Sequence, residues 1–278
     1  MIVERPGNES ICIMQNDLLA ETEAYRLYLG RGLNTTDAML CRVVKKPSLN
    51  GVMYSELKLL NELAAMSNSL EEARIVAQGD DGRKIHYDWL FPVCEQSFSS
   101  KQLDGRKINV LNMQGAPLDD FVPLAKLKSN IKVDAKSAAW ILGRFLKLQA
   151  FLDEDGNYHS LDFNPDMVLV APKSHHVVYI GWFDDLLLGG DRSRNRVELI
   201  SRLNLDRMFY TIETWVELNN TPGEEEFLAW LKSANGRFSN GLRAHMAYYD
   251  FLNELWGSGY YPFTFKENGT WKSVDKLV

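Results

Sequence analysis

Short runs of β-branched and apolar residues dominate the first part of the chain, and one helical pattern interrupts them. The run from Ala38 to Val44 predicts a strand that ends before Pro47, because proline cannot donate to a strand ladder. Apolar residues then recur at helical spacing and predict a helix over about 51–66 (Met53, Leu57, Leu60 and Leu63). Two further runs, 89–98 and 107–113, predict the strands of a hairpin joined by a polar turn.

After the Gly-Ala-Pro at 115–117 the pattern becomes mostly helical. The apolar spacing predicts helices over 138–152, 205–218, 224–232 and 241–255. Between the first two of these helices, apolar runs at 167–170 and 177–180 flank a short turn and predict an embedded hairpin. Phe263 and Phe265 mark a short aromatic tail.

The predicted elements divide the chain into a β-rich part over 1–113 and a mainly helical part over 114–278, with the second hairpin at about 158–182. At 278 residues the chain is long enough for one large domain or for two lobes that share a cleft. No Pro/Gly/Ser-rich linker and no internal repeat is visible. We therefore expect an α+β fold with a small antiparallel-sheet lobe that carries one helix and a larger, mainly helical lobe.

Composition narrows the classes of partner. The chain has 37 acidic and 31 basic residues, a mildly acidic balance that argues against sequence-independent binding of nucleic acid. No stretch approaches 18 apolar residues, and the first residues lack the pattern of a secretion signal, so we expect no membrane partner. The three cysteines (Cys12, Cys41 and Cys94) form no CxxC pair, which is typical of reduced thiols in a cytoplasmic protein.

Two charged residues in the β-rich part form a candidate pair. On the strand over 38–44, side chains alternate between faces, so Arg42 can point to the same side as Leu40 and Val44. Glu56 lies on the helix that follows. Lys46 has the same facing as Arg42 and is the alternative cation, although it stands at the end of the strand. The plainest alternative is that Arg42 and Glu56 are both solvated surface residues.

This order of elements resembles the protein-kinase-like fold, over roughly residues 25–267, and among its members divergent bacterial kinase-like domains. In that family a strand lysine, oriented by a helix glutamate, holds the α and β phosphates of the nucleotide. The resemblance implies that Arg42 takes the lysine position and Glu56 the glutamate position. It also implies that Met113 and Gln114 face an adenine. Lysine to arginine is not a conservative change, because a planar fork replaces a compact ammonium.

The segment Ser160-Leu161-Asp162-Phe163-Asn164-Pro165-Asp166-Met167 fits the register of the family's catalytic loop, HRDLxxxN. The resemblance implies that Asp162 takes the position of the catalytic base. Met167 takes that of the metal-binding asparagine, and a thioether is a poor ligand for Mg²⁺. The alternative is that Asp162 is a polar loop residue that caps a turn.

The family's second metal ligand is the aspartate of the DFG motif. Nineteen residues after Asp162 the chain reads Ile180-Gly181-Trp182, so Gly181 fills that position. Asp184 and Asp185 follow and could reach the site only if the loop refolded. Asp206 resembles the buried aspartate that anchors the catalytic-loop backbone, and a helix N-cap is an equally good interpretation.

These replacements favour a pseudokinase-like protein, noncatalytic and regulatory, whose partner is another protein. ATP stays a candidate ligand, and Mg²⁺ is not expected. The alternative is an active atypical protein kinase or small-molecule phosphotransferase that uses Asp162 with recruited aspartates (Asp166, Asp184 or Asp185). A third alternative is an α+β interaction protein without kinase ancestry, which a lack of pairing between residues 38–44 and 107–113 would favour.

Overall fold

A computed structural model describes residues 2–4, 10–32, 38–78, 86–113, 120–153, 163–182, 194–257, 259 and 261–274. The chain forms two compact units. The first unit contains Met1–Phe121 and Val178–Leu186, and the second contains Val122–Val177 and Leu187–Val278. The chain therefore leaves the first unit, returns to it for a short segment, and then completes the second unit.

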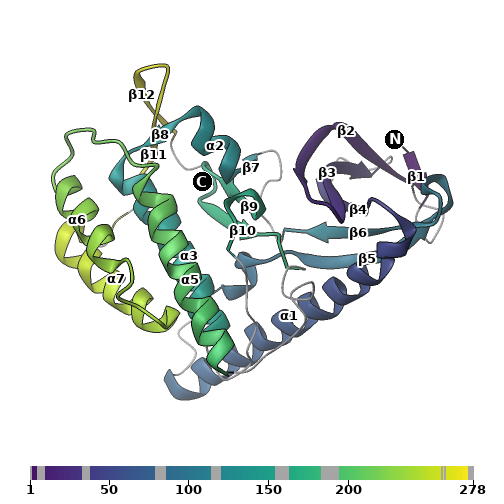
Figure 1. Cartoon of the computed structure of the whole chain (residues 1–278), viewed down its shortest axis with the longest axis horizontal. Coiled ribbons are helices and arrows are strands. Elements are labelled where there is room, and N and C mark those ends of the chain that lie inside the picture. Colours follow the sequence, from purple (N-terminus) through teal and green to yellow (C-terminus); the bar gives the residue numbers. More distant parts are fainter. Residues whose placement is uncertain are drawn as a thin grey trace. The chain divides into compact units, whose positions relative to one another are not determined.

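A six-stranded antiparallel sheet forms the body of the first unit (Figure 1). Its strand order is β1-β2-β3-β4-β6-β5. The bounds are β1 (Ile2–Glu4), β2 (Ser10–Glu21), β3 (Tyr25–Gly32), β4 (Ala38–Val44), β5 (Val93–Ser100) and β6 (Arg106–Asn112). Leu40 to Val43 pair with Ile108 to Leu111, so the predicted strands 38–44 and 107–113 are neighbours.

One long helix, α1 (Asn50–Gln78), packs on β5 and β6. It runs well past the predicted end at residue 66, and its last buried side chains are Met66 and Ser67. Beyond them few side chains turn inward, so apolar spacing gives no signal there. Good helix formers and the pair between Arg74 and Glu71, three residues apart, favour helix without burial.

Both faces of β4 are buried, which explains why every residue of this strand except Arg42 is apolar. On one face a cluster of buried apolar residues forms the core, to which β4 contributes Met39, Cys41 and Val43. The cluster also contains residues from β1, β2, β5 and β6, such as Val3, Ile13, Phe98 and Val110. The other face carries Leu40, Arg42 and Val44, all fully buried. A charged side chain therefore lies among apolar neighbours at the middle of the sheet.

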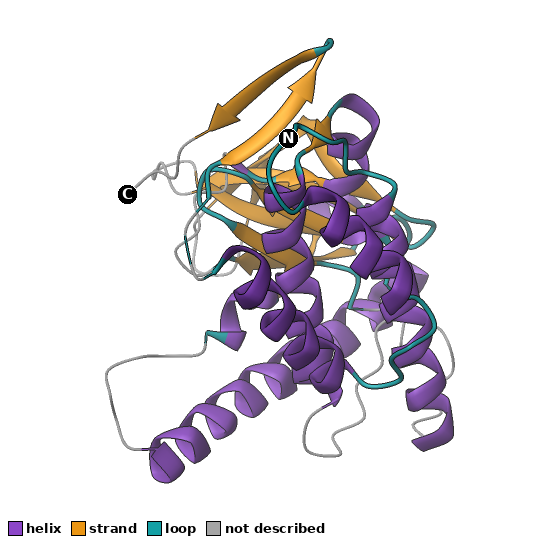
Figure 2. Cartoon of the chain, turned by 90° about the vertical axis from the view of Figure 1, so that its left-hand side faces the viewer, coloured by secondary structure: helices purple, strands orange, loops and turns teal. Residues whose placement is uncertain are grey.

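Helices make up most of the second unit (Figure 2). They are α2 (Leu124–Asn130), α3 (Ala135–Asp153), α5 (Arg194–Glu213), α6 (Glu224–Ala234) and α7 (Gly241–Trp256). The central helix is α3, which contacts α5, α6 and α7. The four predicted helices are present, but the predicted helix over 205–218 is shifted, because α5 begins at Arg194 and ends at Glu213. In its first turns the buried residues are polar (Ser201 and Asn204) and the apolar Leu199 and Leu203 are exposed, so apolar spacing gave no signal there.

Two small sheets complete the second unit and its junctions. One has the order β10-β9-β7, with β7 (Val122–Pro123), β9 (Val168–Ala171) and β10 (His176–Tyr179), and it contains the predicted hairpin. The other has the order β12-β11-β8, with β8 (Lys132–Val133), β11 (Phe263–Glu267) and β12 (Thr270–Val274).

The hairpin of β11 and β12 projects away from the helices (Figure 2). The sequence pattern predicted only a short aromatic tail in this segment. Its turn residues Asn268 and Gly269 both have positive φ, at 50° and 80°. An Asn-Gly dipeptide between alternating residues is the strongest short-range hairpin signal, so the turn was readable from the sequence.

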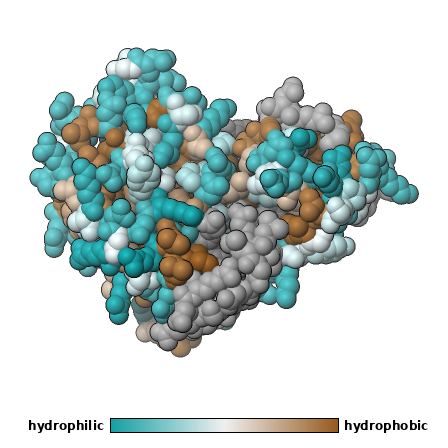
Figure 3. Space-filling view, in the orientation of Figure 1, coloured by the Kyte–Doolittle hydropathy of each residue, from teal (hydrophilic) through white to brown (hydrophobic). Residues whose placement is uncertain are grey.

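The face shown in Figure 3 is mostly hydrophilic over α6 and α7, with hydrophobic residues scattered between polar ones. Single exposed apolar side chains of this kind are normal on a protein surface. None of the helices in the described ranges is both long and apolar enough to cross a membrane. The antiparallel sheet with one helix, followed by a mainly helical part, confirms the predicted α+β fold class.

Candidate functional site

Arg42 occupies the middle of the sheet in the first unit. Its register partners are Leu27 on β3 and Asn109 on β6, and Asn109 pairs in turn with Ser97 on β5. The Arg42 side chain has 0% exposure, which is rare for a charged residue unless it is paired. The side chain is held by partners from three different segments of this unit.

The guanidinium of Arg42 binds a carboxylate and a backbone carbonyl at once. Its Nη1 donates to Glu56 Oε1, and its Nη2 donates to the carbonyl oxygen of Ile180. Its Cζ lies 4.6 Å from the centroid of the Tyr25 ring, within the range of a cation–π contact. The structure therefore brings together Arg42 and Glu56 as an ion pair, and Lys46, the alternative cation, is exposed.

The Glu56 carboxylate is also fully buried and both of its oxygens are bound. Asn109 Nδ2 donates to Glu56 Oε2 at 2.6 Å and to the carbonyl oxygen of Met53 at 3.1 Å. Ser97 Oγ donates to Asn109 Oδ1 at 2.5 Å and so orients the amide. Burial raises the pKa of the Glu56 carboxyl, while the Arg42 guanidinium and the Asn109 amide oppose that rise.

The segment that contains Gly181 is fixed on both sides. Before it, the carbonyl of Ile180 accepts from Arg42. After it, Trp182 is 3% exposed, and its Nε1 donates to the carbonyl oxygen of Tyr179 at 2.6 Å. The Trp182 ring also meets Phe91 edge to face at 6.1 Å. Gly181 itself is buried and brings no side chain to the position where the family has an aspartate.

In the second unit the structure describes the predicted catalytic loop from Phe163 onward. Asp162, the predicted base position, lies outside the described residues. The backbone N–H of Phe163 donates to Asn204 Oδ1 at 2.9 Å, and Asn204 Nδ2 donates to Gln149 Oε1 at 3.1 Å. Asn204 and Gln149 are 1% and 2% exposed. Asn204 on α5 therefore anchors the backbone directly after Asp162.

The family resemblance implied that Asp206 would have this anchoring role, and a helix N-cap was the alternative interpretation of Asp206. The N-cap interpretation is wrong, because α5 begins at Arg194 and Asp206 lies inside it. Its Oδ1 instead accepts from the backbone N–H of Gly236 at 2.7 Å. Asn204 could have been found in the sequence as a polar residue at a position where the apolar spacing of α5 predicts burial. Gln149 stands at a similar position in α3, so the two polar residues could have been predicted to pair.

Met167, at the metal-binding position implied by the resemblance, has its side chain in the core at 4% exposure. Asp166 is exposed, and its backbone N–H donates to the Asn164 side chain at 3.0 Å, which closes a short 3-10 turn. Met113 directly follows β6 and is buried. Gln114, Asp184 and Asp185 lie outside the described residues.

Within the described ranges, no three His, Cys, Asp or Glu side chains come close enough to hold a metal ion. Cys41 and Cys94 are buried thiols, and burial raises the pKa of the Cys94 thiol to about 12. His175 lies in the predicted turn and has a φ of 55°. Its ring stacks on the ring of Trp140, with 4.5 Å between the two ring centroids.

Solved structures of kinase domains are similar to this chain in fold. Vaccinia related kinase 3 matches with 13% identity and a TM-score of 0.49, over 86% of this chain and 74% of that chain. The PknI kinase domain of Mycobacterium tuberculosis matches with 11% identity and a TM-score of 0.43, over 86% and 95%. A double mutant of the same domain matches with 11% identity and a TM-score of 0.47, over 84% and 93%.

No protein-family model matches the sequence, and no curated protein matches it either. With identities this low and TM-scores below 0.5, these likenesses assign no role to any residue. The described elements themselves, an antiparallel sheet with one helix and then a mainly helical part with an embedded hairpin, follow the order of the predicted kinase-like fold.

Proposed function

We propose that this protein is a noncatalytic, kinase-like module that acts through binding to another protein. The observation that supports the noncatalytic part of the proposal is the burial and hydrogen bonding of Arg42. Its guanidinium has no accessible surface, and its two terminal nitrogens bind Glu56 and the Ile180 carbonyl. A cation held in this way cannot contact a nucleotide phosphate unless its strand, helix and loop partners move apart.

The choice of arginine fits a structural role better than a catalytic one. A planar guanidinium can bind a carboxylate and a carbonyl in fixed directions at the same time, which the ammonium of lysine does less well. Arg42 thereby connects β4, α1 and the segment after β10. In this arrangement the protein itself, and not a bound nucleotide, keeps these three elements in place.

The residues at the two metal-binding positions implied by the resemblance do not fit Mg²⁺. Catalysis of phosphoryl transfer depends on metal ions that neutralise the developing charge, and Mg²⁺ prefers oxygen ligands. Met167 offers a buried thioether and Gly181 offers no side chain. Together with the buried Arg42, these two residues support a role that does not depend on phosphoryl transfer.

A nucleotide titration tests the noncatalytic part of the proposal. Calorimetry with ATP, with and without Mg²⁺ or Mn²⁺, is expected to show no metal-dependent binding up to millimolar nucleotide. Purified protein is also expected to transfer no γ-phosphate to itself or to general substrates. Transfer that is present in the natural chain and lost in Asp162→Ala would overturn the proposal in favour of an active phosphotransferase.

The binding part needs its own test, because an inactive protein is not thereby a binding protein. The protein isolated from its source cells is expected to elute in a complex of fixed stoichiometry with another protein. The Asp162→Ala variant is expected to form the same complex, since binding would not depend on that carboxylate. Elution of the protein by itself under all conditions would count against the interaction role.

A further inference from the structure

A second feature of the molecule lies entirely within the second unit and takes no part in the network around Arg42. A pocket of about 340 Å³ opens between α3 and α7 and extends to the segment after α7. Pockets that bind small molecules commonly fall in the range of about 300–1,000 Å³. This pocket is therefore large enough for a compact ligand of one or two rings.

The charged side chains that line the pocket are all positive. Lys136 and Arg144 line it, and no carboxylate is among its lining residues. Neither cation has an ion pair with a described Asp or Glu side chain. Burial lowers the pKa of the Arg144 guanidinium, since the charged form loses water without gaining a carboxylate. A ligand that carried a negative charge would supply the missing partner.

Aromatic side chains form much of the wall. Lys136 Nζ lies 4.3 Å from the centroid of the Tyr261 ring and 5.6 Å from that of Trp256. Tyr249 and Trp140 line the pocket as well. Rings of this kind favour a planar, aromatic ligand.

The floor of the pocket contains Gly143, in the middle of α3. Glycine inside a helix is less favourable than alanine, because it loses more backbone freedom on folding. Nothing nearby requires it, because a Cβ at this position would lie 3.7 Å from Tyr248 Cε1 and 3.9 Å from Tyr249 Oη, which are ordinary contacts. The glycine lines the pocket without a side chain, so this turn of α3 takes up the least possible room in it.

We propose that this pocket binds a small anionic aromatic molecule, such as an aryl or indolyl carboxylate. The carboxylate would pair with Arg144 and Lys136, and the ring would pack among Trp140, Tyr249 and Tyr261. The inference does not depend on the proposed function, since none of these residues belongs to the network around Arg42.

Calorimetric titration of the full chain with two matched probes tests the charge requirement. Indole-3-acetate is expected to bind saturably, and the neutral indole-3-acetamide at least about tenfold more weakly, since a charge-assisted hydrogen bond contributes about 1.5–3 kcal/mol. Equal binding of the two probes would overturn the proposal, and so would a lack of saturable binding of the acid at millimolar concentration.

Variants locate the site. Arg144→Gln is expected to weaken binding of the acid about tenfold and to leave binding of the amide nearly unchanged. Gly143→Leu keeps both cations and is expected to abolish binding of both probes, because its side chain would fill the floor. This second variant decides the question if Arg144→Gln fails to fold in a thermal melt.

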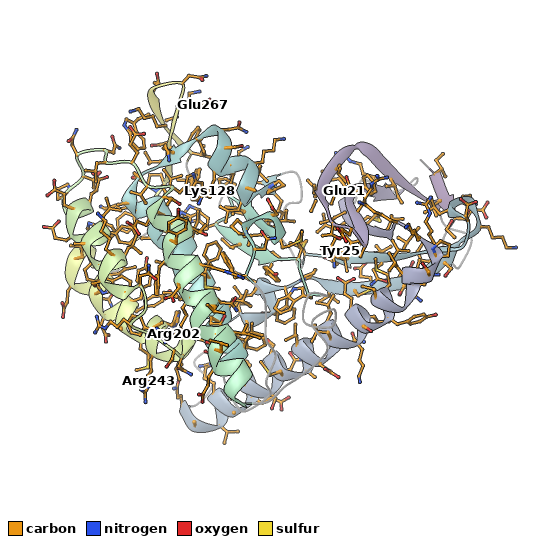
Figure 4. The ribbon with its side chains drawn as sticks, viewed as in Figure 1. Glu21, Tyr25, Lys128, Arg202, Arg243 and Glu267 are labelled. Carbon is orange, nitrogen blue, oxygen red and sulfur yellow. The ribbon has the colours of Figure 1, made fainter. Side chains whose placement is uncertain are left out.

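Arg243→Gln serves as the matched control. Arg243 is an exposed arginine on α7 (Figure 4), one of the two helices that line the pocket, but it is not itself a lining residue. It is expected to bind both probes as the natural chain does. Loss of binding in Arg243→Gln, or unchanged binding in Gly143→Leu, would place the probe elsewhere and overturn the proposal.

Discussion

Two arginines removed from water behave differently in the two units of this protein. In the first unit Arg42 is fully buried and binds Glu56 and the Ile180 carbonyl. In the second unit Arg144 is partly buried at a pocket whose lining residues include no carboxylate. The terminal nitrogens of the first guanidinium bind acceptors of its own chain, and the second guanidinium lines a pocket.

The difference shows that burial of a charge does not by itself mark a binding site. A buried cation whose acceptors all come from the protein is part of the structure, and removing one partner leaves the other charge without compensation. A cation that has no carboxylate partner in the chain and lines a pocket can pair with a negatively charged ligand. The Arg42 network thus supports a structural role, and the Arg144 pocket supports a ligand site.

The largest expected effect on stability comes from breaking the buried pair of Arg42 and Glu56. Glu56→Gln removes the charge that compensates Arg42 and is expected to lower the free energy of unfolding by about 3–5 kcal/mol, the usual cost of breaking a buried pair. Urea denaturation of the full chain measures the loss.

The matched control is Glu21→Gln, which removes an exposed acid that pairs with Arg26 and Lys45 (Figure 4). Exposed pairs contribute little, so a much smaller loss is expected. Comparable losses in Glu56→Gln and Glu21→Gln would mean that the buried pair is not structurally important.

The same substitution at the two arginines should have opposite consequences. Arg42→Met leaves Glu56 buried without its cation and is expected to destabilise the chain by several kcal/mol, on the order of 3–5. Arg144→Met removes a cation that has no carboxylate and is expected to be neutral or to stabilise by up to about 1 kcal/mol. Thermal and urea unfolding would show this, and a large loss in Arg144→Met would reveal a partner for that cation.

Acid should weaken the second unit through His245 on α7. Burial, and to a smaller extent Lys147, lowers the pKa of this imidazole to about 4 from its ordinary value near 6.5. Between these values the unfolded chain binds more protons than the folded chain, so stability is expected to fall as the pH drops from about 6.5 towards 4. A series of urea titrations across this range measures the slope, and His245→Gln should reduce it.

The smallest expected effect concerns the pocket floor. Gly143→Ala is expected to stabilise the chain by about 0.5–1 kcal/mol, because alanine is the better helix former and its methyl group meets only ordinary contacts. Gly223→Ala is the opposite case. Gly223 has φ of 87°, and a Cβ there would lie 2.7 Å from Trp256 Nε1, so this variant should destabilise.

Local patterns predicted a large part of the fold. The strand over 38–44, the hairpin in the β-rich part and four helices of the second unit followed from the spacing of apolar residues and from turn residues. The same reasoning placed Arg42 and Glu56 on neighbouring elements with suitable facings, because a strand period of two and the start of a helix fix side-chain directions.

Other features left no periodic signal. The second half of α1 buries few side chains, and in the first turns of α5 the buried residues Ser201 and Asn204 are polar, so the spacing of apolar residues predicted neither segment. Asn204 was missed for a related reason, since its partners Phe163 and Gln149 lie far from it in the sequence.

The sequence by itself determined the residue types: an arginine in the apolar strand β4, a methionine and a glycine at the two positions where the resemblance implies oxygen ligands, and a glycine inside the helix α3. Only the tertiary structure decided which of the two arginines has acceptors and which faces a pocket. Burial and pairing depend on segments that are distant in the chain and meet only on folding, and they set the free energy of a charge.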